Sequence, residues 1–207
     1  MKRCIFTLLL LALTASGYSQ RSTVNDTALN RQCSALREII YQAATYQFAP
    51  LLDKPLRQSN GQRTDGQWTF SLQKYSTWLP WQGANQTTIE HATDYRDSTY
   101  TQYWQYIAQF NAIRLAPEAS RLAYQLVGQI NQCILPLTDS ITANLTPVPP
   151  EELPPTMPEG LSEAYLFVLP AAFGPQVQIS IMTGIEQVRV GYRPLLIIEW
   201  QKVEMRR

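Results

Sequence analysis

The sequence predicts an α+β protein in which two helices pack on one face of a mainly antiparallel sheet of about five to six strands. Two observations predict this class. Two segments carry apolar residues every three to four positions, and most of the remaining chain consists of short strand-like segments. The expected order is helix, three strands, helix, linker and three strands. This order also allows two α-β-β-β halves, although no matching residues relate them.

The first predicted helix begins near Ala28 and ends before Pro50. Its apolar face consists of residues three to four positions apart, namely Leu29, Cys33, Leu36, Ile40 and Ala43. The stretch 57–66 that follows is polar and contains glycine, so a loop is expected there.

Three strands are predicted next, over residues 67–75, about 87–95 and 99–110. In the third, aromatic and apolar residues alternate with glutamines, which is typical of a strand with one buried face. Turn-forming residues at 96–98 join the second and third strands into a hairpin.

A second helix is predicted from Pro117, which suits the first helical turn, to just before Pro136. Its apolar stripe contains Ala119, Leu122, Leu126, Ile130 and Cys133. Residues 136–160 are rich in proline and indicate an extended linker or surface loop. Three more strands are expected over 164–169, 176–183 and 187 to about 203.

Residues 1–19 have the order of a cleavable secretion signal: a basic start, a short apolar run and a small, polar end. Cleavage after Gly17 or after Ser19 satisfies the requirement for small residues, and the second is preferred. The apolar run is shorter than the roughly 20 residues that a spanning helix needs. We therefore expect a single mature domain over 20–207, located in the periplasm or outside the cell, with no membrane span after cleavage.

Charge and cysteine content change when the signal leaves. The chain has 17 basic and 16 acidic residues, and loss of Lys2 and Arg3 leaves 15 basic residues. A nearly neutral surface argues against nucleic acid as a partner. Loss of Cys4 leaves Cys33 and Cys133, one on each helical stripe. In an oxidising compartment these two are expected to form a disulfide.

The sequence contains no recognisable catalytic or metal-binding pattern, so neither a cofactor nor a metal is expected. The single histidine, His91, would alternate to the strand face opposite Glu90 and Asp94, which leaves it without an orienting carboxylate. Glu90, Asp94 and Asp97 are the carboxylates on which a hydrolase could depend.

Aromatic residues are the most suggestive feature for binding. Segment 77–82 is expected to be a loop that carries Trp78 and Trp81, and Tyr95 and Tyr103 belong to the hairpin that follows. If exposed, such rings could bind a sugar or a peptide, and if buried they would belong to the core. The predicted binding residues are therefore Trp78, Trp81, Tyr95 and Tyr103.

Two helices that each carry a cysteine on the apolar face, with strands after both, resemble small exported bacterial α+β proteins of unknown function. The segment that carries this resemblance best runs from Glu118 to Cys133. The resemblance covers most of the mature chain but implies no activity and no catalytic residues.

These observations predict an exported, non-enzymatic binding or interaction module for an unknown protein, peptide or glycan. Two alternatives stay open. One is a carboxylate-dependent hydrolase of envelope or extracellular polymers, and the other is a secreted inhibitor or scaffold.

Overall fold

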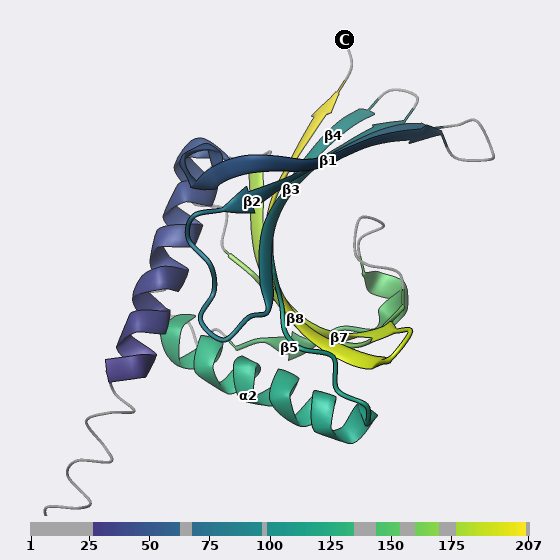
Figure 1. Ribbon diagram of the computed structural model, residues 1–207. Helices are drawn as coiled ribbons and strands as arrows, with labels where there is room; N and C mark the ends of the chain where they lie inside the picture. Colours follow the sequence, from purple (N-terminus) through teal and green to yellow (C-terminus); the bar gives the residue numbers. More distant parts are fainter. Residues whose placement is uncertain are drawn as a thin grey trace, which may run out of the picture.

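A computed structural model of the protein describes residues 27–62, 68–96, 99–134, 144–153, 160–169 and 177–205. The predicted signal, residues 1–19, lies outside this part of the chain. The described residues form an α+β fold with two helices and one antiparallel sheet, shown in Figure 1.

Eight strands make up this sheet, in the spatial order β1-β2-β3-β4-β8-β7-β6-β5. Their bounds are β1 Leu52–Gln62, β2 Trp68–Thr77, β3 Gln86–Arg96, β4 Thr99–Gln109, β5 Thr146–Pro147, β6 Leu161–Val168, β7 Val177–Val188 and β8 Gly191–Met205. The first four strands and the last four each form a meander, and β4 joins β8 in antiparallel register. This arrangement is compatible with two related halves, and their duplication stays a prediction.

The expected number of five to six strands is wrong, because two strands were not anticipated. β1 occupies most of the segment that was expected to be a loop, and its polar sequence with Pro55 gives no apolar alternation. β5 is only two residues long and lies in the proline-rich segment, where η3 (Pro150–Glu152) follows it. The other six strands lie where the sequence predicts them.

Both predicted helices are present. The first spans residues 27–46 of the described chain, and α2 spans Ala116–Ile134. They do not form the simple layer on one sheet face that the sequence predicts. α2 packs against β7 and β8, whereas the first helix stands beside the sheet and meets α2 near one end, as Figure 1 shows.

The predicted disulfide is present where the two helices meet. Cys33 is bonded to Cys133, with 4.9 Å between their Cα atoms. The bond joins the early part of the first helix to the last turn of α2, and both cysteines belong to the largest core cluster.

The two faces of the sheet carry different cores. Alternate residues of the central strands enter the largest cluster together with both helices, and we call this side the core face; examples are Ile89, Tyr106, Ile181, Ile198 and Trp200. The opposite side carries a smaller cluster of Ile107, Ala164, Met182, Leu195 and Ile197, against which Leu153 packs. Figure 1 shows a strongly curved sheet with η3 on the inside of the curve, so we call this side the concave face.

No helix in the described ranges is both long enough and apolar enough to cross a membrane.

Candidate functional site

A line of polar residues crosses the concave face from strand to strand. Its six members are direct partners in the register of neighbouring strands, and we call them the polar row: Arg57, Lys74, Glu90, Gln105, Glu199 and Ser180. The row therefore runs from the edge strand β1 through the centre of the sheet to β7. Because neighbouring strands lie about 4.8 Å apart, its length is roughly 24 Å.

The inner part of the row is buried and hydrogen-bonded. Gln105 Nε2 donates to Glu199 Oε2 at 2.6 Å. Glu199 is only 2% exposed, and Gln105 and Ser180 are also buried. Burial of a charged carboxylate is tolerated only when polar partners compensate for lost hydration. The inner row is thus a fixed polar element beside the apolar side chains of Ile107 and Ile197.

The outer part of the row is accessible. Lys74 Nζ lies 2.6 Å from Glu90 Oε1, and both side chains are partly exposed. Arg57, on the edge strand, is exposed. The row therefore passes from a buried pair in the centre to an ion pair and then to an exposed guanidinium.

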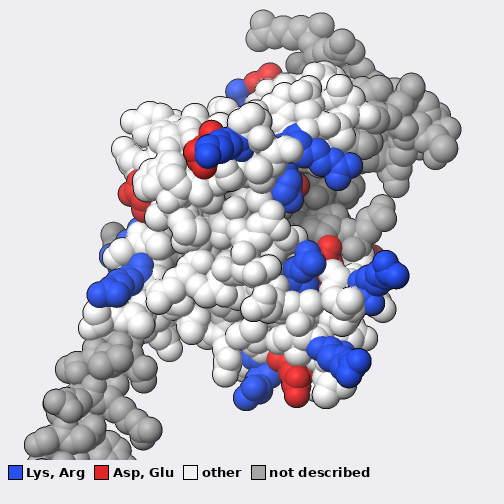
Figure 2. All heavy atoms as spheres, viewed as in Figure 1, with Lys and Arg blue, Asp and Glu red and all other residues white. Residues whose placement is uncertain are grey.

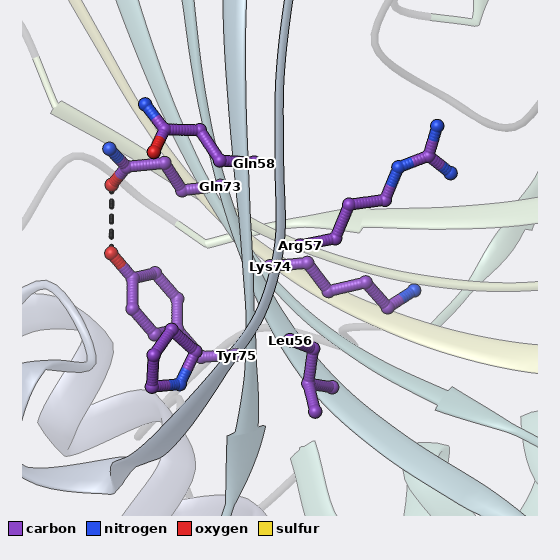
Figure 3. A pocket seen from close by; sticks show the side chains of 7 residues that line it. Leu56, Arg57, Gln58, Gln73, Lys74 and Tyr75 are labelled. Atoms are coloured by element: carbon purple, nitrogen blue, oxygen red, sulfur yellow. Dashed lines mark hydrogen bonds between the residues drawn. The ribbon is translucent and has the colours of Figure 1, made fainter.

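A shallow pocket of about 280 Å³ lies at this open end. It is lined by residues of β1 and β2, namely Pro55, Leu56, Arg57, Gln58, Gln73, Lys74 and Tyr75. In Figure 3, Arg57 and Lys74 extend to one side, and Gln58, Gln73 and Tyr75 extend to the other.

The local sequence explains the pocket. Register shifts occur between Leu52 and Pro55 and between Pro55 and Arg57, so β1 departs from regular pairing with β2 there. Proline has no backbone N–H for the ladder and is tolerated at such an edge position. On the side of the ribbon opposite to Arg57 and Lys74, Tyr75 Oη donates to Gln73 Oε1 at 2.8 Å, which fixes both side chains (Figure 3).

The two loop tryptophans have different environments. Trp78 is 58% exposed, and its Nε1 donates to the backbone oxygen of Pro50. Trp81 is 3% exposed and belongs to the largest core cluster. Trp78 therefore keeps an accessible ring in a fixed orientation, whereas Trp81 contributes to packing.

The two tyrosines of the predicted binding set also lie apart. Tyr95 is 41% exposed, and its ring centroid lies 5.0 Å from that of Tyr100. Tyr103 is 5% exposed and lies on the concave face, two residues from Gln105. The four predicted binding residues thus do not form one exposed surface, and ligand binding through them stays a prediction.

His91 lies on the core face, opposite to Glu90, as alternation predicts. Its ring stacks on Trp104 with 4.1 Å between centroids. Burial lowers the pKa of His91 below its ordinary value of 6.5. Its buried Nε2 makes no hydrogen bond with the described part of the protein. The ring is thus packed within the sheet, and no carboxylate of the described residues orients it through Nε2.

The carboxylates suggested for hydrolysis are placed as follows. Glu90 is paired with Lys74, and Asp94 is buried four residues further along β3. At about 3.4 Å per residue their Cα atoms are roughly 14 Å apart. Asp97 lies outside the described residues. Within the described ranges, no group of three or more His, Cys, Asp or Glu side chains could hold a metal ion.

Sequence reasoning missed Glu199 and Arg57. Glu199 interrupts the apolar run 195–200, and a lone carboxylate in such a run was the available signal. Nothing in the sequence indicated a role for Arg57, because a loop was predicted for the segment 57–66. The alignment of the row depends on strand register, which a single sequence does not reveal.

Comparison with known proteins gives no assignment. No family model, no curated protein and no solved structure matches the chain. The resemblance to small exported bacterial proteins therefore stays a prediction.

Charged side chains are dispersed on the visible surface. In Figure 2, Lys and Arg are scattered among uncharged residues, Asp and Glu are less prominent, and neither sign forms one large field. Local arrangements of charge, such as the polar row, are thus more informative than net charge.

Proposed function

We propose that the protein is an exported, non-enzymatic binding module whose ligand contacts the open end of the polar row. The observation that carries this proposal is the pocket between β1 and β2. The polar row has a buried, hydrogen-bonded inner part, and its outer end is exposed to solvent at this pocket. Binding sites commonly combine a preformed concavity with a few fixed polar groups.

Fixed side chains support a binding role. Lys74 is held by Glu90, Gln73 by Tyr75, and the Trp78 ring by the oxygen of Pro50. Ordering of flexible side chains is one of the costs of association, at about 0.5–1.5 kcal/mol each. Side chains that are already held reduce this cost.

The arrangement favours an extended ligand. Trp78 follows Tyr75 by three residues, which places it roughly 10 Å from the pocket along the same ribbon. Leu56, which lines the pocket, is 51% exposed. A peptide or a glycan laid along β1 and β2 would contact the pocket, with its apolar Leu56 side chain, and then the Trp78 ring.

A binding module has more support than a hydrolase. Hydrolysis of a glycosidic bond uses two carboxyl groups about 5–9.5 Å apart, one of them kept protonated. Glu90 is instead paired with a lysine, and Asp94 lies four residues further along β3, with roughly 14 Å between the two Cα atoms.

Export is the second part of the proposal. A disulfide such as Cys33–Cys133 persists best in an oxidising compartment. The start of the sequence also has the pattern of a secretion signal.

Photo-crosslinking in the producing cell tests the proposal. A benzophenone amino acid is introduced at Leu56 in the exported protein, and at Leu115 as a matched control with a similarly exposed leucine at 55%. We expect adducts from position 56 and few from position 115. Adducts are identified by peptide mass spectrometry and by glycan staining. Equal yields from the two positions, or none from position 56, would contradict the proposal.

A further inference from the structure

We infer that the pocket at the open end of the polar row binds an anionic group, a carboxylate or a phosphate. The inference rests on the proposed binding function and specifies the chemistry of its ligand. Its basis is an excess of positive charge at one point of the sheet.

Two cations face each other across β1 and β2. Arg57 and Lys74 are direct partners in the register, and Figure 3 shows both side chains extending to the same side. Side chains in this relation have Cβ atoms about 4.5–5.5 Å apart, and like charges there destabilise a strand pair. The fold alone gains nothing from this juxtaposition.

Only one carboxylate of the row, Glu90, lies on the strand next to these two cations. Glu90 lies next to Lys74 and contacts its Nζ at 2.6 Å. None of the ion pairs between described residues includes Arg57. The outer row therefore holds two positive charges against one negative charge, and an incoming anion would restore the balance.

The chemistry of Arg57 suits such a ligand. A guanidinium presents a planar fork of donors that matches the two oxygens of a carboxylate or phosphate. Lys74 adds a second charge from the neighbouring strand on the same side of the ribbon, and both cations are among the residues that line the pocket.

A simpler explanation for an arginine at position 57 is protection of the exposed sheet edge. Charged residues on edge strands discourage pairing with other chains. Lys54 and Pro55 already serve that purpose on β1. Edge protection does not account for a second cation directly opposite Arg57, and the ion pair with Glu90 balances only one of the two charges.

The test is an amide NMR titration of the mature, oxidised protein at constant ionic strength. The probes are sodium glucuronate for a carboxylated sugar, inorganic phosphate for a phosphate, and glucose as the neutral control. We expect saturable shifts at residues 56–58 and 73–75 with one or both anions and none with glucose. The anion that saturates these shifts at the lower concentration shows whether the site prefers a carboxylate or a phosphate.

Matched variants complete the test. Arg57→Gln should weaken anion binding by about tenfold or more. Arg121→Gln, which removes an exposed arginine from α2, should leave it unchanged. Absence of saturation at these amides up to roughly 100 mM would overturn the inference. Equal weakening by both variants would also overturn it.

The two proposals fail separately. If glucose rather than an anion produces the shifts, or if crosslinking from position 56 persists in Arg57→Gln, the binding function stands and the anionic ligand does not. If crosslinking from position 56 fails, the binding function itself is lost.

Discussion

At the scale of single residues, His91 provides a direct link between burial and pH. Its ring is packed against Trp104, and burial lowers its pKa. Well above pH 6.5 the imidazole is neutral in both the folded and the unfolded chain. Between pH 6.5 and the lower folded-state pKa, the unfolded chain binds a proton that the folded chain does not. His91 should therefore reduce the free energy of unfolding as the pH falls through this window.

NMR can measure this effect without ambiguity, because the chain has one histidine. We expect the Cε1 proton of His91 to titrate with an apparent pKa below 6.5. His91→Gln should remove the corresponding part of the pH dependence of unfolding below pH 6.5 and leave the part from carboxylates. A pKa at or above 6.5 would show that the ring is solvated, contrary to its packing here.

Residue identity alone predicted some placements and not others. The opposite faces of Glu90 and His91 followed from alternation, which is a local property of a strand. The environments of Trp78 and Trp81 did not follow, because they depend on tertiary contacts: one ring reaches the oxygen of Pro50, and the other enters the core. Glu199 was equally hidden, since its partner Gln105 comes from a distant part of the sequence.

At the scale of elements, prediction succeeded where burial imposes a pattern. The two helices and six strands carry an apolar face against a core, and that face fixes the period of the sequence. β1 is exposed over most of its length and has a single neighbour, so its residues are free to be polar. The candidate pocket lies on this strand, which explains why the site was harder to predict than the fold.

Two glycines test the packing of individual elements. A Cβ at Gly184 of β7 would lie 2.5 Å from the backbone oxygen of Glu163 on β6, whereas a Cβ at Gly128 of α2 would meet nothing within 4 Å. Gly184→Ala should therefore destabilise the protein by about 1–3 kcal/mol, because one strand must move. Gly128→Ala should stabilise it by roughly 0.5–1 kcal/mol through helix propensity.

Urea unfolding of the two variants under oxidising conditions measures both effects. The free energy of unfolding is expected to fall for Gly184→Ala and to rise for Gly128→Ala. A neutral Gly184→Ala would mean that β6 and β7 are less closely packed than described, and a destabilising Gly128→Ala would mean that this part of α2 is not exposed.

At the scale of the whole molecule, the disulfide is the covalent link between the two halves of the chain. Cys33 and Cys133 are 100 positions apart and join the helices at the point where they meet. Each meander of four strands follows one of these helices, so the bond connects the two halves on the helical side while β4 and β8 connect them within the sheet.

Loss of this bond should lower the stability of the entire fold. Closing a loop of about 100 residues contributes about 4–5 kcal/mol in the chain-entropy model. The double variant Cys33→Ala/Cys133→Ala should lose most of this, plus a smaller packing term, because both sulfurs lie in the core. Urea unfolding of the wild type with and without dithiothreitol separates the two contributions, since reduction breaks the bond but keeps both sulfurs. A loss below about 1 kcal/mol on reduction would show that the unfolded chain already keeps the helices together.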